Sequence, residues 1–597
     1  MKAQPRIGAG AGRTSAGMLA GVLAGMLSGV LVLAGCGGLP ESGPVHHYAG
    51  SNDNTPQEPA YFSPPGPRPG DTPVGIVKGF MLAMQANPLS TAVARSFLSA
   101  HARATWKPNE GTVVYGASTV SQGSRGNVTL RLVDAHHLDA RGGWINQPPG
   151  RTETMQLHLV QDRGQWRIDD PPNALVVIES YFQGKFAPFN LYFYDQTGRV
   201  LVPEPVYLPR GEQTATNLVR GLLAGPGRGL AHVVRSAFPL GTDLDLSVTV
   251  SESGVAEVPL NGDVLKLPPE QLARAMAELA WTLRQVPGLA RVRMTVDGAP
   301  VPLPDGRIDV SVEEGMRFAP GPHALHPAVA ISRGRVVSLG QGAPKAVGGP
   351  FGDPGFALRS LAVDGSANRL AAVAANGRTV YVGPLARSSP RASVARAFDG
   401  TDVLRPAFDM FGDLWLVDRT PTGAAVHVLR GRHGRELRVR GLTGESVAAF
   451  ALSPDGTRLV TALTGGATPR LQVTSIVRSA EGQVRHLGPT RQLPVAASDA
   501  GPALDVGWAS PTTVAVLTRS GRSASQVLFL LADGSPGDGS PNAATPLSGV
   551  ATGLVSGGNP RLPILVVTGD GRLLQLNGNG QWTRRLPGGV VAAAFPG

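Results

Sequence analysis

The chain has 597 residues, 42% of them hydrophobic and 16% charged, and a formal net charge of +11. This length exceeds what one hydrophobic core supports, and 78 glycines with 52 prolines favour short strands and many turns over long helices. The positive charge suits anionic lipid headgroups or anionic wall polymers, although the codon usage of a GC-rich genome gives a similar excess of arginine. The sequence has no dense basic block with interleaved aromatic residues, so nucleic acid is not an expected partner.

Residues 1–35 have the pattern of a lipoprotein signal peptide. Three basic residues and no acidic one precede residue 18, and the apolar run 18–34 mixes Leu and Val with Ala and Gly. An uncleaved transmembrane anchor is the alternative, but the run is short for a hydrocarbon core of about 30 Å. No second apolar run reaches 18 residues, so the chain after it is expected to be water-soluble.

The signal ends in Leu33-Ala34-Gly35-Cys36, which resembles a bacterial lipobox. The resemblance implies that Leu33, Ala34 and Gly35 are recognised by the lipoprotein signal peptidase. It also implies that Cys36, the single cysteine, becomes the first mature residue and carries an S-diacylglycerol and an N-palmitoyl group. A buried or nucleophilic thiol is the alternative. Two or three acyl chains would hold the protein at the extracytoplasmic face of the cell membrane.

Residues 36–70 are predicted to be a lipidated, flexible tether. Proline, glycine and small polar residues dominate this segment, and it has no hydrophobic period. A coil of this length averages about 30 Å from end to end. The tether would lift the following domains off the bilayer.

Residues 71–185 are predicted to form an α+β domain. Apolar spacing indicates one helix from about 74 to 86 and a second from Leu89 to Trp106. Strand patterns follow at 112–115, 128–133, 154–160 and 166–168. Helices followed by a curved antiparallel sheet are similar to the NTF2-like fold.

Residues 186–310 also have an α+β pattern. Two strands flank a turn at 195–198, Thr214 can cap a helix that Gly225-Pro226 ends, and a longer helix is expected over 270–286. Alternation over 291–296 predicts a half-buried strand. We expect helices packed on one sheet.

Four ordered motifs in this segment closely resemble the GerMN domain of spore-germination and envelope proteins. They are Leu191-Tyr192-Phe193, Leu222 to Pro226, Ala237 to Thr242, and Thr282 through Gly298. The resemblance covers most of residues 190–300 and implies no catalytic residues.

Residues 311–597 show weak internal repetition, in which a strand, a turn and a second apolar strand recur every 44–56 residues. The copies are LAVDGSANRLAAV from Leu361, PAFDMFGDLWLVD from Pro406, FALSPDGTRLVTA from Phe450, VGWASPTTVAVLT from Val506 and NPRLPILVVTGDGRLLQL from Asn559. This period is typical of a β-propeller, here of five to seven blades, with an irregular β-sandwich as the alternative. Trp415 and Trp508 recur near the same expected blade position.

Catalytic motifs are missing from the sequence: it contains no GxSxG, HExxH, Walker A or CxxC pattern. The glycine-rich segment 225–229 follows a helix and lacks Lys-Ser/Thr, so we interpret it as a helix C-cap turn. Adjacent Asp169 and Asp170 precede two prolines and are not expected to act as an acid/base pair. We therefore expect no catalytic residue, metal ligand or cofactor, and interpret the chain as a non-enzyme.

The order of lipobox, tether, α+β domain, GerMN domain and propeller resembles the LpqB family of actinobacterial lipoproteins. Its strongest marks outside the GerMN motifs are Leu404-Arg405-Pro406 and the stretch from Leu414 to Arg419. The resemblance implies an accessory to the MtrA–MtrB two-component system that contacts the extracytoplasmic region of the MtrB kinase in cell-wall homeostasis and division. The alternative is a cell-wall glycan-binding protein or hydrolase with its site on the propeller face.

Overall fold

The computed structural model describes residues 62–124, 126–145, 150–321, 325–386, 393–495, 500–536 and 545–597, all within one unit that spans 60–597. The predicted signal peptide, the lipobox residues Leu33 to Cys36 and most of the tether lie outside these residues and stay predictions. In the described part, no helix is long and apolar enough to cross a membrane.

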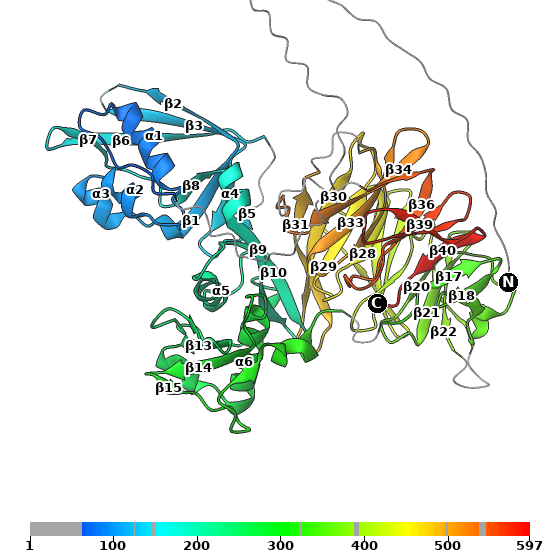
Figure 1. Cartoon of the computed structure of the whole chain (residues 1–597). Coiled ribbons are helices and arrows are strands. Elements are labelled where there is room, and N and C mark those ends of the chain that lie inside the picture. Colours follow the sequence, from blue (N-terminus) through cyan, green and yellow to red (C-terminus); the bar gives the residue numbers. More distant parts are fainter. Residues whose placement is uncertain are drawn as a thin grey trace, which may run out of the picture. The chain divides into compact units, whose positions relative to one another are not determined.

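The first part of the described chain is α+β, as predicted (Figure 1). Its two four-stranded sheets have the orders β5-β4-β1-β8 and β2-β3-β6-β7, and β1 and β8 run parallel, so the expectation of one antiparallel sheet is wrong. The elements are α1 (Pro73–Ala83), α2 (Ala92–Ser96), α3 (Ala100–Thr105), β1 (Gly111–Tyr115), β2 (Ala117–Gln122), β3 (Asn127–Val133), β4 (His136–Asp139), β5 (Trp144–Ile145), β6 (Glu153–Asp162), β7 (Gln165–Ile168), β8 (Leu175–Ile178) and α4 (Glu179–Lys185).

The single helix predicted from Leu89 to Trp106 is two short helices. Phe97 ends α2, and the Ser99 hydroxyl accepts the backbone N–H of Ala102, which starts α3 afresh. A serine side chain competes with the helical backbone for hydrogen bonds, so it favours a cap over a helix interior.

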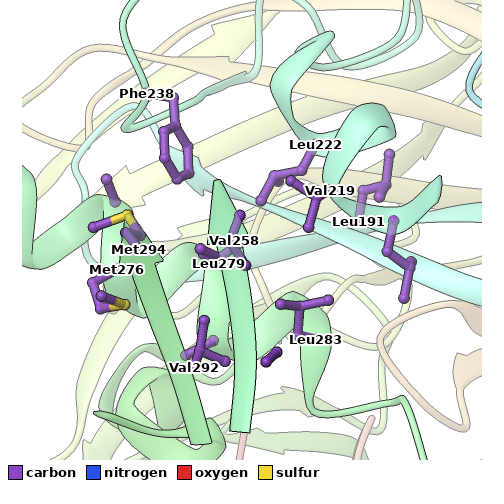
Figure 2. Close-up of a cluster of buried hydrophobic side chains, with 14 of the residues drawn as sticks. Leu191, Val219, Leu222, Phe238, Val258, Met276, Leu279, Leu283, Val292 and Met294 are labelled. Atoms are coloured by element: carbon purple, nitrogen blue, oxygen red, sulfur yellow. The ribbon is translucent and has the colours of Figure 1, made fainter. Parts of the chain in front are cut away.

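The second part packs α5 (Thr214–Leu223) and α6 (Pro269–Leu283) against two sheets, where one was expected. Their orders are β10-β9-β11 and β12-β13-β14-β15, with β16 also paired to β14. Figure 2 shows Leu191, Leu222, Leu279 and Met294 in the common core. The strands are β9 (Phe186–Asp195), β10 (Leu201–Pro209), β11 (Val234–Arg235), β12 (Thr249–Val250), β13 (Val255–Pro259), β14 (Arg291–Val296), β15 (Ala299–Pro300) and β16 (Val310–Ser311).

Helix α5 ends as predicted but begins differently. Gly225 follows the helix with φ +79°, the left-handed conformation that a C-cap turn requires of glycine. Thr214 is not the cap: it is already helical, and its hydroxyl donates to the carbonyl oxygen of Gly211 at 2.7 Å.

The remaining described strands form six four-stranded sheets. The innermost strand of every sheet contributes residues to the lining of one common cavity, so the sheets are the blades of a propeller. The strands are β17 (Val329–Ser332), β18 (Arg335–Ser338), β19 (Lys345–Ala346), β20 (Leu358–Val363), β21 (Arg369–Ala374), β22 (Thr379–Pro384), β23 (Ala395–Asp399), β24 (Ala407–Phe408), β25 (Leu414–Thr420), β26 (Gly423–Arg430), β27 (His433–Leu437), β28 (Val447–Leu452), β29 (Arg458–Leu463), β30 (Arg470–Arg478), β31 (Val484–Leu493), β32 (Ala503–Trp508), β33 (Thr513–Ser520), β34 (Ala524–Leu531), β35 (Thr545–Ser548), β36 (Ala551–Val555), β37 (Leu565–Thr568), β38 (Leu573–Leu576), β39 (Trp582–Leu586) and β40 (Val590–Ala594).

One blade is assembled from both ends of the propeller segment. Its order is β19-β18-β17-β40, and Val329 of β17 pairs with Ala594 of β40. The C-terminal strand thereby completes the first blade and joins the two ends of the ring. The six blades fall within the predicted range of five to seven.

Four of the five sequence repeats correspond to the first hairpin of a blade. The first four copies cover the first two strands of successive blades, but the copy from Asn559 begins in a loop and covers the second and third strands, β37 and β38. The two tryptophans are also not equivalent. Trp415 lies on the second strand of its blade and Trp508 on the first of its own, so that interpretation is wrong.

Candidate functional site: the central cavity of the propeller

The innermost strands surround a cavity of about 680 Å³. It opens among the loops that join the first and second strands of the blades, and residues 364–366, 409–412, 453–454 and 556–558 of these loops line it. A volume of this size accommodates a small ligand or several side chains of a partner.

Five aromatic side chains are among the residues that line the cavity. Phe408, Phe450, Trp508 and Phe595 are buried side chains that line it, and Phe411 is half-buried beside them. Each comes from a different blade except Phe408 and Phe411, so no fixed sequence spacing marks the cluster, and the sequence analysis missed it. The available signal was an aromatic residue in the Pro406, Phe450 and Val506 repeats.

An ion pair that joins three blades lies at this cavity. Arg405 precedes β24, and both of its terminal nitrogens lie 3.0 Å from the carboxylate oxygens of Asp505 on β32. The same guanidinium donates to the carbonyl oxygens of Leu554 on β36 and Val506. Burial raises the pKa of the Asp505 carboxyl, and the charge of Arg405 opposes that rise. Arg405 of the Leu404-Arg405-Pro406 motif therefore links three blades of the propeller. We call its ion pair with Asp505 the clamp.

The carboxylates that line the cavity are occupied by their own loops. Asp364 accepts the backbone N–H groups of Asn368 and Arg369 at 2.8 and 2.9 Å. Asp409 accepts the backbone N–H of Asp413, the indole N–H of Trp415 and the guanidinium of Arg478. These acceptors fix the turns, as Asp side chains commonly do.

An ionic network, buried except at Arg430, supports the same loops. Arg478 and Asp409 are buried partners at 2.6 Å, and Arg430 binds Asp413 with nitrogen–oxygen distances of 2.7 and 2.8 Å. Both guanidiniums also donate to the carbonyl oxygen of Gly482, which lies in the blade of Arg478 and in the blade next to that of Arg430. Every charge in this network has a partner, so the network serves to hold the cavity wall rigid.

The cavity lining combines apolar walls with carboxylates that already have hydrogen-bond partners. Aromatic and aliphatic carbons dominate the walls, and its carboxylates already accept several hydrogen bonds each. Over the described ranges, no group of three or more His, Cys, Asp and Glu residues is arranged to hold a metal ion. The exposed thioether of Met410 at the rim, 40% accessible, adds an adaptable apolar contact.

The other sequence candidates lie elsewhere. Asp169 accepts a hydrogen bond from the Ser99 hydroxyl, so it supports the start of α3. The Gly225–Gly229 segment is a turn in which the Gly227 N–H donates to Glu204. Neither contributes to the propeller cavity.

Three family models match consecutive parts of the chain. The model described as lipoprotein LpqB, N-terminal domain, matches residues 66–183. The model for sporulation and spore germination matches residues 190–302, and that for the lipoprotein LpqB beta-propeller domain matches residues 334–596. The GerMN resemblance and the propeller prediction are thereby confirmed.

Relatives match most or all of the chain. A protein named lipoprotein LpqB from Streptomyces coelicolor is 28% identical, with 99% of this chain and all of the relative covered. Lipoprotein LpqB of Cutibacterium acnes is 27% identical over 82% of this chain and 85% of its own. Among solved structures, the first GerMN domain of GerM from Bacillus subtilis covers 21% of this chain and 97% of its own, with 22% identity and a TM-score of 0.18.

Proposed function

Because this chain belongs to the lipoprotein LpqB family, we propose that it is a lipid-anchored, extracytoplasmic accessory protein of an MtrB-type sensor kinase. It binds the extracytoplasmic region of the kinase and tunes signalling in cell-wall homeostasis and division. The single observation that carries this proposal is the aromatic cavity, whose carboxylates are already occupied by its own loops. Such a surface suits the side chains of a partner protein, and in this proposal the protein acts as a non-enzyme.

The anchor is essential to this proposal. Confinement to the membrane raises the effective concentration of the protein beside a membrane receptor, so a weak contact suffices for regulation. The tether of residues 36–70 gives the binding surface its reach.

Cys36→Ser is expected to abolish lipidation and to release the protein from the membrane or stall its processing. The fold should be unaffected, because the variant changes only the acylated thiol. Fractionation with a carbonate wash measures the outcome, and the wild-type protein provides the bound reference. Retention of the variant in the washed membranes would show that the anchor is elsewhere.

Met410→Glu is expected to weaken binding of the purified kinase sensor region at least tenfold, because it places a charge at the apolar rim of the cavity. The matched control is Met316→Glu, at a 54% exposed methionine outside the propeller. Calorimetric titration of the full chain with the sensor region measures both. Equal affinity of the two variants for the sensor region would show that the rim of the cavity is not part of the interface.

A wall-glycan ligand is the second candidate, favoured by the aromatic cluster that folding assembles. Aromatic side chains can stack on sugar rings, and the half-buried Phe411 lies in the cavity lining. Incubation with purified peptidoglycan fragments distinguishes the two proposals. Saturable binding abolished by Met410→Glu would favour the glycan, and specific hydrolysis would overturn the non-enzyme proposal.

A further inference from the structure

The longest basic run of the propeller lies on the outer edge of one blade. Residues 430–440 read RGRHGRELRVR, with five arginines, one histidine and one glutamate. They comprise the turn before β27, the strand itself and the residues after it, and β27 is the outermost strand of the sheet β24-β25-β26-β27. We call residues 430–440 the basic edge.

Three arginines of the basic edge have no partner in the described part of the chain. Arg432, Arg438 and Arg440 are exposed, and their guanidiniums make no hydrogen bond, ion pair or cation–π contact there. The other two have structural roles: Arg430 binds Asp413, and Arg435 donates to the carbonyl oxygen of Val484. The edge thus presents free guanidiniums to solvent.

The free arginines lie on both sides of β27, Arg432 in the turn before the strand and Arg438 and Arg440 after it. Leu437 and Val439 are buried, whereas Arg438 and Arg440 are exposed, as extended backbone requires. Arg432 lies eight residues before Arg440, which corresponds to at most about 26 Å of extended chain. Cationic groups that are separated along the chain in this way can contact successive anionic units of a linear polymer.

The neighbouring blade extends the positive surface. The basic edge contacts β31, because the Thr490 hydroxyl donates to the carbonyl oxygen of Arg440 at 2.8 Å. That strand carries the exposed side chains of Arg485 and His486.

Protection of the sheet edge is the simpler explanation for charge at this position. It accounts for one charged side chain on an outer strand, but it does not account for three unpaired arginines in nine residues. The outer strand β35 (TPLS) of another blade carries no charge at all, so this fold does not need a basic edge for protection.

We propose that the basic edge binds a linear polyanion built from phosphodiester-linked units, of the kind found in anionic wall polymers. Guanidinium groups recognise phosphate oxygens through paired N–H donors, and their spacing along the edge lets several phosphates of one chain bind together. The site is separate from the cavity residues, so its occupancy does not depend on the proposed kinase contact. It would place the propeller at the wall polymer as well as at the membrane.

The test uses the full chain in neutral detergent and a fluorescently labelled linear polyphosphate, with anisotropy followed over a series of salt concentrations. The triple variant Arg432→Gln, Arg438→Gln, Arg440→Gln is expected to bind at least tenfold more weakly at about 0.1 M salt. Loss of three phosphate contacts should lower the slope of log K against log salt by about 2. Because these side chains have no partner in the described chain, thermal unfolding should be unchanged.

The matched control is Arg210→Gln, Arg220→Gln, Arg228→Gln, which removes the same charge from exposed arginines outside the propeller. We expect less than a threefold loss of affinity. Equal losses in both triple variants would assign binding to net charge alone and overturn the proposal, as would absence of wild-type binding at low salt. Stronger edge-dependent binding to micelles doped with phosphatidylglycerol than to polyphosphate would assign the edge to lipid instead.

Discussion

Replacing Arg405 by leucine is expected to destabilise the propeller by about 3–5 kcal/mol, the usual cost of leaving a buried charge without its partner. The substitution strands the carboxylate of Asp505, whose side chain is only 12% exposed, and removes donors from two carbonyl oxygens in two blades. Chemical denaturation followed by tryptophan fluorescence measures the change, since Trp415 and Trp508 are buried in the propeller.

Two further variants separate the buried charge from the loss of contacts. Asp505→Asn in the Arg405→Leu background removes the stranded charge and should recover part of the stability. Arg396→Leu breaks an exposed pair with Asp399 and should change the stability much less, because water screens an exposed ion pair. If Arg405→Leu costs no more than Arg396→Leu, the clamp does not hold the blades together.

Glu278→Gln is expected to stabilise the second part of the chain near pH 8. Glu278 is completely buried on α6, and burial raises the pKa of its carboxyl to about 8 from an ordinary 4.5. The backbone N–H of Ala237, at 2.6 Å, and the Ser236 hydroxyl, at 3.1 Å, donate to it and partly oppose the rise. Glutamine can accept from the first and donate to the second.

The pH dependence follows from proton binding. Below about pH 4.5 the carboxyl is protonated in both the folded and the unfolded chain; between pH 4.5 and 8 only the folded chain keeps the proton. The free energy of unfolding therefore decreases as pH rises through this window, by on the order of 4 kcal/mol. Glutamine does not titrate, so the variant should lose this decrease.

Hydrogen exchange of α6 and β11, compared between wild type and variant at each pH, measures local opening in this part of the chain. Protection should be similar at pH 5 and higher in the variant at pH 8. Glu270→Gln, at an exposed position of the same helix, is the control. Equal protection of wild type and Glu278→Gln at pH 8 would contradict the raised pKa.

Local signals in the sequence predicted most of the fold. The spacing of apolar residues located α1 and α6, and Gly225 marked the end of α5, because these features depend on residues a few positions apart. The apolar pattern predicted one continuous helix across Ser99. The Ser99 hydroxyl instead caps α3, and a single capping side chain does not change the apolar pattern that predicted the helix. The β17–β40 pairing had no local signal and could not be predicted.

The candidate site was less predictable than the fold. Repeats located the turns of Asp409 and Asp455, but the clamp between Arg405 and Asp505 joins residues 100 positions apart. The aromatic side chains of the cavity come from four blades, so no single repeat displays them. The lipobox differs from the cavity because its whole signal lies in four adjacent residues, Leu33 to Cys36. Its assignment stays a prediction, which the Cys36→Ser variant tests.

The pairing of β17 with β40 has a consequence for the order of events during synthesis. Val329 and Ala594 are 265 residues apart, so the first blade stays incomplete until nearly the whole chain has left the ribosome. The α+β parts precede the propeller and can fold while it is still being made, because domains generally fold as units from the N-terminus. The aromatic cavity forms last, so a chain that stops early has no assembled binding surface to offer a partner.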